Sequence, residues 1–407
     1  MDWGRGFQDE VSRDMRSFRR KQEDMAFSIE GSLGVDRTGL KLKSSLLQGQ
    51  QLRLVLKALY GDANYLKAFD DLPRRYRALA TDLETGKPVI LDRGDISEAV
   101  LASMTIPAIY PPVEINGRLL VDGGMANNIP IDVARELGAD IVIVVDISTP
   151  MAKRAELDSM LSIVDQLTNF LTRSNADKQL KSLTDQDILI IPELGDVTSA
   201  DFSRSDEIVE MGATAARDAV VSLHTLSLEK PAWELFSRSK SRSIGLSDEI
   251  IHQIKIINNT DINTEIIRQR LRLKPGKRLK RDKLEHDLGV IYGLGYFESV
   301  NYRIIEENGV NTLIINADKR SWGPNYLRFS LDYQEDFDVE SQFNVSTLFN
   351  MTELNRYGAE WSSSLQIGSE PHFISNVYQP LATNNAQYVS FGFGIKKENF
   401  NVFIFGF

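Results

Sequence analysis

The stretch GRLLVDGGMANNIP, residues 117–130, points to the fold of the first half of the chain. It follows Asn116, and an Asn-Gly pair between two short apolar segments, here 113–115 and 118–121, is the strongest local signal of a β-hairpin. The second predicted strand leads into Asp122, which two glycines follow. A carboxylate at the exit of a buried strand, beside glycines that let another backbone come close, is suited to act as a general base. Asp-Gly is also common in ordinary turns, which is the alternative interpretation.

The segments around this stretch alternate between helix and strand patterns. Residues 131–137 predict a short helix. Residues 141–145 form a continuous apolar run, as expected for a parallel strand that is buried on both faces. A second such run at 188–191 lies between two helical segments, 152–180 and 205–226. Helices between buried strands indicate an α/β fold.

The composition excludes several classes of function. The chain has 407 residues, a net charge of −10 and no cysteine. The charge argues against a nucleic-acid-binding protein, because no overall positive field attracts phosphates. Without cysteine there is no disulfide and no thiolate site, and no cluster of histidines and carboxylates has metal-ligand spacing. We therefore expect no metal and no other cofactor. No apolar segment reaches the ~20 residues of a transmembrane helix, so a membrane role would depend on β-strands.

Two further regions follow residue 240. Residues 250–320 predict the order strand, helix, helix, strand, strand, with a turn at Asn308-Gly309. From residue 326 onward, apolar and polar residues alternate over segments of about ten residues, as in the run of Leu327, Phe329, Leu331 and Tyr333. Alternation of this kind is typical of an outer-membrane barrel, and a soluble antiparallel sheet with one wet face produces it as well. Periodicity alone leaves both interpretations open.

Several spaced motifs resemble the second conserved block of patatin-like phospholipases. They are ASMTIP (102–107), YPPV (110–113), GRLLVDGG (117–124) and NNIP (127–130), in the order that the family shows. The resemblance extends over about residues 20–230. It implies an α/β patatin fold and hydrolysis of lipid esters by a Ser-Asp dyad. Asp122, in the Asp-Gly-Gly motif with Gly123 and Gly124, would then be the general base of that dyad.

The serine of such a dyad is not found in this sequence. The family needs a Gly-x-Ser-x-Gly elbow and a glycine-rich oxyanion loop, and the chain contains neither. Ser32 comes nearest, but Glu30 stands where the elbow requires glycine, and Ser103 lies in a predicted helix. Neither serine is expected to be the nucleophile. A Ser-Asp dyad needs no histidine, which agrees with the absence of histidine before His224. We expect a chain that begins downstream of the elbow and is inactive alone.

The second and third regions have resemblances of their own. Residues 283–302, which include YGLGYFESV at 292–300, are similar to the end of an α+β POTRA domain. The region from Trp322-Gly323-Pro324 resembles the start of the surface-antigen (D15-like) outer-membrane barrel, which favours the barrel over the soluble sheet. We therefore predict three parts: the C-terminal portion of a patatin-like domain (1–240), a POTRA domain (246–320) and the first strands of an antiparallel barrel (324–407). This order resembles the type V secretion patatin autotransporters of Gram-negative bacteria.

These resemblances imply an exported lipid acyl hydrolase of the phospholipase A type at the outer membrane or cell surface. Its partners would be a phospholipid substrate, outer-membrane lipid and the barrel-assembly machinery. Two alternatives remain: an outer-membrane transport or assembly factor with a non-catalytic lipid-binding passenger, and a lipid-binding pseudoenzyme. The basic residues 16–21 are expected on a solvated helix face, with contact to anionic headgroups as the alternative. The barrel is also expected to be incomplete, because about 80 residues give fewer strands than the roughly eight of the smallest barrels.

Overall fold

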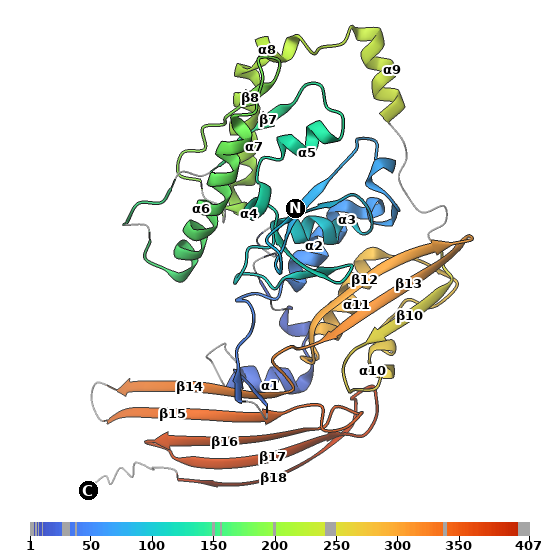
Figure 1. Ribbon diagram of the computed structural model, residues 1–407. Coiled ribbons are helices and arrows are strands. Elements are labelled where there is room, and N and C mark those ends of the chain that lie inside the picture. Colours follow the sequence, from blue (N-terminus) through green and yellow to red (C-terminus); the bar gives the residue numbers. More distant parts are fainter. Residues whose placement is uncertain are drawn as a thin grey trace, which may run out of the picture. The chain divides into compact units, whose positions relative to one another are not determined.

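The computed structural model describes residues 4, 6, 8–9, 11–26, 33–36, 39–148, 151–154, 157–197, 201–240, 250–336 and 340–397. The chain divides into two compact units (Figure 1): one of Met1–Asp9 with Ser45–Ser247, and one of Glu10–Ser44 with Asp248–Phe407. Residues 10–44 thus group with the second unit, although the sequence places them in the predicted domain 1–240. The predicted domain boundaries stay a prediction.

The first unit contains a four-stranded antiparallel sheet with the strand order β4-β3-β6-β5. Its strands are β3 (Ala78–Asp82), β4 (Pro88–Leu91), β5 (Val113–Ile115) and β6 (Arg118–Asp122). The predicted hairpin is confirmed, because β5 and β6 pair from Ile115 opposite Arg118. Asn116 and Gly117 between them have φ of 53° and 74°. Positive φ at both positions is what a type I′ turn requires, so this turn sets the register of β6 and places Asp122 at its end.

The helix α3 (Ile96–Met104) packs on this sheet, and α2 (Gln50–Tyr60) packs on α3. α3 begins at Asp95, whose side chain accepts hydrogen bonds from the backbone N–H groups of Ser97 and Glu98 and so caps the helix. The shared core is apolar and includes the fully buried side chains of Leu56, Phe69 and Leu120. Since α3 contacts both β3 and β6, its C-terminal end comes close to the end of β6.

The rest of the first unit is mostly helical. It comprises α4 (Gly124–Asn127), α5 (Ile131–Glu136), β7 (Ile143–Val145), α6 (Met160–Leu180), β8 (Ile188–Ile190), α7 (Ser205–Asp218), α8 (Val220–His224) and α9 (Lys230–Lys240). β7 and β8 pair in parallel, as predicted, but as a two-stranded sheet of their own. The apolar run 141–145, which contains β7, was predicted to be buried on both faces, and this prediction is wrong. Val144 packs against Ala176 of α6, whereas Ile143 and Val145 are about half exposed. In the described part of the chain, no helix is long and apolar enough to cross a membrane.

The second unit confirms the predicted α+β order strand, helix, helix, strand, strand. These elements are β10 (Gln253–Asn258), α10 (Glu265–Arg268), α11 (Arg281–Tyr292), β12 (Phe297–Glu307) and β13 (Val310–Lys319), and two short strands, β9 (Ile250–Ile251) and β11 (Lys277–Arg278), pair beside them. The sheet order is β10-β13-β12, with β10 parallel and β12 antiparallel to β13. α11 buries Leu284, Leu288 and Ile291, which the helical period places on one face.

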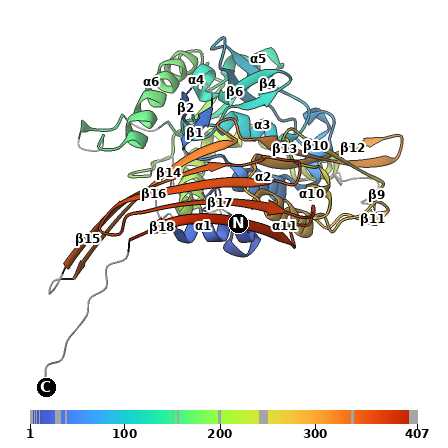
Figure 2. The same cartoon turned by 90° about the horizontal axis from the view of Figure 1, so that it is seen from below.

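A seven-stranded antiparallel sheet completes the second unit, in the order β18-β17-β16-β15-β14-β1-β2. Five long strands follow one another along the chain and lie side by side in Figures 1 and 2: β14 (Asn325–Asp336), β15 (Glu340–Met351), β16 (Glu360–Gly368), β17 (His372–Pro380) and β18 (Tyr388–Lys396). The predicted antiparallel strands are therefore confirmed. Two strands from the N-terminal part, β1 (Leu33–Asp36) and β2 (Gly39–Lys41), extend the sheet beyond β14, which the sequence did not indicate.

The two faces of the five long strands have opposite polarity. Cross-strand neighbours on one face are apolar and exposed, namely Tyr333 opposite Phe343, Leu365 opposite Phe373, and Val377 opposite Phe391. The other face is polar, and several of its side chains are buried, namely Asn344, Ser346, Asn350, Glu360 and Ser362. A soluble sheet with one wet face has the reverse arrangement, with its apolar face packed on a core.

Candidate active site

Asp122 is the last residue of β6, and its backbone is held from two sides. Its N–H donates to the carbonyl of Thr105, just after α3, at 2.9 Å. Its own carbonyl accepts a hydrogen bond from the hydroxyl of Thr81 on β3 at 2.7 Å, where Ala80 and Asp122 are register partners. The main chain at Asp122 is therefore fixed between α3 and the neighbouring strand.

Other atoms come close to the α-carbons of Gly123 and Gly124. A Cβ on Gly123 would lie 2.1 Å from the carbonyl oxygen of Leu79, which no side chain tolerates. A Cβ on Gly124 would lie 2.8 Å from Oδ1 of Asn128 and 3.1 Å from Oδ1 of Asp122. The N–H of Gly123 also donates to the carbonyl of Ser103 at 3.2 Å. The Asp-Gly-Gly motif is thus a tight turn from β6 into α4.

The carboxylate of Asp122 is partly buried and accepts one short hydrogen bond, from the N–H of Gly124 to Oδ1 at 2.7 Å. Burial raises the pKa of Asp122, and the Gly124 N–H opposes this shift in part. Among the residues that the structure describes, no charged side chain contributes to this shift. A carboxylate that burial destabilises, and that no cation neutralises, binds a proton more readily than an exposed one. This is the property that a general base working near neutral pH needs.

The turn is also held from α6, which the sequence did not indicate. The side-chain amide of Asn175 donates to the carbonyl of Gly124 at 2.8 Å and accepts from the N–H of Asn128 at 2.8 Å. One helical turn further on, Oε1 of Gln179 accepts the N–H of Asp132, the second residue of α5, at 3.2 Å. The only local signal for these roles is a pair of amide side chains four residues apart within a long predicted helix.

The other candidates of the sequence analysis are placed as follows. Ser103 lies near the end of α3 and contributes its carbonyl to the turn, whereas Ser32 lies outside the described residues. Among the residues that the structure describes, no group of three or more histidine or acidic side chains could hold a metal ion.

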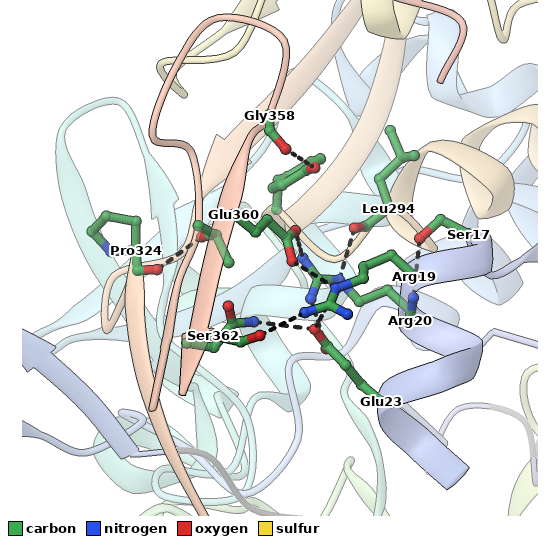
Figure 3. A network of polar contacts seen from close by, with 12 residues as sticks. Ser17, Arg19, Arg20, Glu23, Leu294, Pro324, Gly358, Glu360 and Ser362 are labelled. Atoms are coloured by element: carbon green, nitrogen blue, oxygen red, sulfur yellow. Dashed lines mark hydrogen bonds and ion pairs between the residues drawn. The ribbon is translucent and has the colours of Figure 1, made fainter. Parts of the chain in front are cut away.

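A second polar cluster lies in the second unit, between α1 (Phe18–Ala26) and the polar face of the long strands (Figure 3). Arg20 forms ion pairs with Glu23, at 2.7 Å, and with Glu360 of β16. Arg19 lies 3.5 Å from Glu360 and donates to the hydroxyl of Ser362 at 3.0 Å. The prediction that this basic run lies on a solvated helix face is therefore wrong for Arg19 and Arg20. Their partners on β16, Glu360 and Ser362, lie more than 300 positions away in the chain, where a local pattern cannot reveal them.

Two family models match parts of the chain. Residues 6–135, which include the Asp-Gly-Gly turn, match the family model of patatin-like phospholipases, and residues 249–320 match the POTRA model, described as a surface antigen variable number repeat. A BamA structure from Haemophilus ducreyi that lacks POTRA domains 1–3 aligns with 38% of this chain and 28% of its own, at 12% identity and a TM-score of 0.28.

The curated relatives match parts of the chain. An uncharacterized NTE family protein of Mycobacterium bovis is 36% identical over 109 residues, which are 27% of this chain and 30% of the relative. A second such protein of that organism is 28% identical over 198 residues (44% and 33%). Patatin-like phospholipase domain-containing protein 7 of Mus musculus is 25% identical over 249 residues (53% and 18%). The chain thus spans a third or less of each of these relatives. It carries a patatin-like phospholipase domain followed by a POTRA domain.

Proposed function

We propose that the first unit supplies the aspartate of a Ser-Asp dyad for hydrolysis of lipid acyl esters, of the phospholipase A type. The observation that carries this proposal is the carboxylate of Asp122, which is partly buried at the end of β6 and held there by the turn into α4. The family match of this region to patatin-like phospholipases supports the same reaction class. Because the 407 residues contain no Gly-x-Ser-x-Gly stretch, we propose that this chain alone is inactive.

In this proposal Asp122 accepts and donates protons and forms no bond to the acyl group. It takes the proton of the serine hydroxyl while the serine oxygen attacks the ester carbonyl carbon, and then passes that proton to the departing alcohol. The acyl-serine is cleaved by water, whose proton Asp122 accepts and returns to the serine. Raising the pKa of Asp122 by burial makes each acceptance easier, because a general base is most effective when its pKa lies near the working pH.

The test compares the 407-residue chain with a serine-bearing form, in which the chain is preceded by the elbow and oxyanion loop of a patatin-like phospholipase. We expect no turnover of phospholipid or short-chain esters by the first and turnover by the second. In the serine-bearing form, Asp122→Asn should lower kcat by about 10²–10⁴-fold with the circular dichroism spectrum unchanged.

Asp82 is a matched control for that substitution. It ends the adjacent strand β3, is buried, and accepts the N–H of Glu84 at 3.0 Å, so it resembles Asp122 in place and burial. Asp82→Asn should leave kcat nearly unchanged. Turnover by the 407-residue chain alone, or a serine-bearing form indifferent to Asp122→Asn, would contradict the proposed dyad.

We propose further that β14 to β18 are the first strands of an outer-membrane barrel that displays the hydrolase at the surface of a Gram-negative bacterium. Their exposed apolar face and partly buried polar face fit a sheet with lipid outside and a polar interior. A POTRA domain directly before these strands supports the same location. The whole chain should then need detergent, whereas a chain that ends near residue 320 should be much more soluble. Equal solubility of the two would contradict the membrane assignment.

A transport or assembly factor is the second candidate, because a POTRA domain and antiparallel strands follow the patatin-like domain. On that view the first unit is a passenger that binds lipid without hydrolysing it. Secretion of an unrelated partner protein by cells that carry this chain would favour this candidate, and loss of Asp122 would not affect that secretion. For either candidate we propose the barrel-assembly machinery as a partner, so that its depletion should remove the protein from the outer membrane.

The proposed domain boundaries can be tested separately. Residues 246–320 should unfold cooperatively as an isolated fragment, since their strands, helices and turns agree in sequence and structure. Residues 11–26 pack on this region as well, for example through the N–H of Ser17, which donates to the carbonyl of Gly293 at 3.0 Å. A fragment without any thermal transition would contradict the boundary at 246–320.

A further inference from the structure

Asn175 on α6 uses both ends of its side-chain amide on the segment that follows Asp122. Its Nδ2 donates to the carbonyls of Gly124 at 2.8 Å and Met125 at 3.2 Å, and its Oδ1 accepts from the N–H of Asn128 at 2.8 Å. The partners fix the orientation of the amide, because exchanging oxygen and nitrogen would set donor against donor and acceptor against acceptor. This amide is therefore one rigid link between α6 and α4.

α4 depends on such a link. It has only four residues, Gly124–Asn127, and a helix of that length cannot satisfy its own terminal carbonyl and N–H groups. Asn175 binds three backbone groups of this segment, the carbonyls of Gly124 and Met125 and the N–H of Asn128. α6 is also in close steric contact here, since a Cβ on Gly124 would lie 3.1 Å from Cγ2 of Thr172, three residues before Asn175.

Gly124 connects this link to the proposed base. Its carbonyl accepts the hydrogen bond from Asn175, and its N–H donates to Oδ1 of Asp122 at 2.7 Å. If Gly124 turned, its N–H would leave the carboxylate and Asp122 would lose its one backbone donor and its fixed direction. We propose that Asn175 is a positioning residue that holds Gly124 in place so that Asp122 is oriented for proton transfer. The inference rests on the proposed role of Asp122 as a general base.

Gln179 provides a matched control from the same helix. It lies one turn beyond Asn175, and its Oε1 accepts the N–H of Asp132 at 3.2 Å, so it holds α5 and not the turn at 122–124. Although burial acts in the opposite direction, hydrogen bonds from Asn127, Gln179 and the backbone hold the pKa of Asp132 below its usual value. Gln179 thus acts on Asp132 directly, whereas Asn175 acts on Asp122 through Gly124, and each should affect mainly its own carboxylate.

The first experiment measures the titration of both aspartates in the 407-residue chain. Aspartate labelled with ¹³C at the carboxyl carbon is followed by NMR against pH, and the two resonances are assigned from their loss in Asp122→Asn and Asp132→Asn. In Asn175→Leu, which keeps the size of the side chain, the midpoint of Asp122 should rise and that of Asp132 should move less, because Asn127 is its only donor on α4 among the described residues. In Gln179→Leu, the midpoint of Asp132 should rise and that of Asp122 should stay. A general loosening of the fold would move both midpoints in both variants.

The second experiment measures rate in the serine-bearing form. Asn175→Leu should lower kcat by at least about tenfold with KM nearly unchanged, because small displacements of a catalytic group are costly. Asn175→Ser, which retains one donor, should lie between wild type and Asn175→Leu and serves if the leucine variant does not fold. An unchanged Asp122 midpoint in both Asn175 variants overturns the inference. If instead the midpoint moves as expected but Asp122→Asn keeps full activity, the positioning geometry holds and the proposed function fails.

Discussion

Asp122 in the first unit and Glu23 in the second are carboxylates taken out of water, but the molecule stabilises them in different ways. Asp122 accepts one backbone N–H, and burial raises its pKa. Glu23 is 4% exposed and lies among three arginines and the side-chain amide of Asn350. Against the effect of burial, Arg20, Arg328 and Arg19 hold the pKa of Glu23 below its usual value.

The difference separates a candidate for chemistry from a structural contact. A carboxylate surrounded by cations is stabilised as the anion and has little tendency to accept a proton, whereas one without a cation keeps that tendency. The Arg-Glu cluster instead joins distant parts of one unit, since α1 and β16 are more than 300 positions apart in the chain. Burial of a charged group alone therefore does not identify an active site. For Glu23 its arginine partners decide the direction of the pKa shift.

The largest expected effect tests the structural role of the Arg-Glu cluster. Glu360→Ala should lower the free energy of unfolding by about 3–5 kcal/mol, because it leaves Arg20 buried without one of its partners. The measurement is urea unfolding of the whole chain in a mild detergent.

Glu370→Ala is the control for this prediction. Glu370 lies in the turn between β16 and β17 and pairs with Lys396 of β18 at 3.6 Å, but both side chains are partly exposed. Such a pair contributes roughly 0–1 kcal/mol, so its loss should be barely measurable. Similar losses for the two variants would mean that the cluster is no more than a surface contact.

How much the sequence could predict depends on how far apart along the chain the residues that determine each feature lie. The Asn116-Gly117 turn, the strand that it places at Asp122 and the order of elements in 250–320 follow from local patterns, and the structure agrees with them. The Asn175–Gly124 contact joins residues 51 positions apart, and Arg20 meets Glu360 across 340 positions. Helical periodicity shows which residues share a face and does not show what that face meets.

The same limit explains the predictions that were wrong. A basic run on a helix is usually solvated, so Arg19 and Arg20 could be placed correctly only with knowledge of Glu360. The apolar run at 141–145 was expected to be buried on both faces, but Val145 on one of those faces is about half exposed. Whether an apolar run is buried depends on the elements that pack against it. The sequence of the run does not show whether those elements are present.

An intermediate effect tests the rigid backbone that Asp122 needs. Gly123→Ala should lower the free energy of unfolding by about 1–3 kcal/mol, because its Cβ would lie 2.1 Å from a backbone oxygen, that of Leu79, which cannot move aside as a side chain can. Gly212→Ala in α7 should have the opposite effect on the free energy of unfolding. Its Cβ would meet nothing within 4 Å, and alanine should stabilise the helix by roughly 0.5–1 kcal/mol. If both glycines tolerated alanine equally, the turn at Asp122 would be more adaptable than the structure indicates.

The smallest expected effect is a change in how stability depends on pH. The folded pKa of Asp122 is raised, so its contribution to stability is fully present below the unfolded pKa of about 3.9 and is lost as pH rises through the folded value. Asp122→Asn should therefore make the chain slightly more stable at neutral pH and remove this loss. The folded pKa of Glu23 is lowered, so its contribution is present above the unfolded pKa of about 4.3 and is lost as pH falls through the folded value.

The measurement is the midpoint of urea unfolding of the wild type, Asp122→Asn and Glu23→Gln over a series of pH values from about 3 to 8, spanning both unfolded pKa values. Both substitutions replace a carboxylate by an amide of nearly the same shape, so packing changes little and the charge is what differs. Asp122→Asn should diverge upward from the wild type as pH rises, and Glu23→Gln should diverge downward over the same range. Divergence of both variants in the same direction would mean that the two carboxylates are held alike. The pKa shifts would then not distinguish a base that can accept a proton from a carboxylate that arginines keep charged.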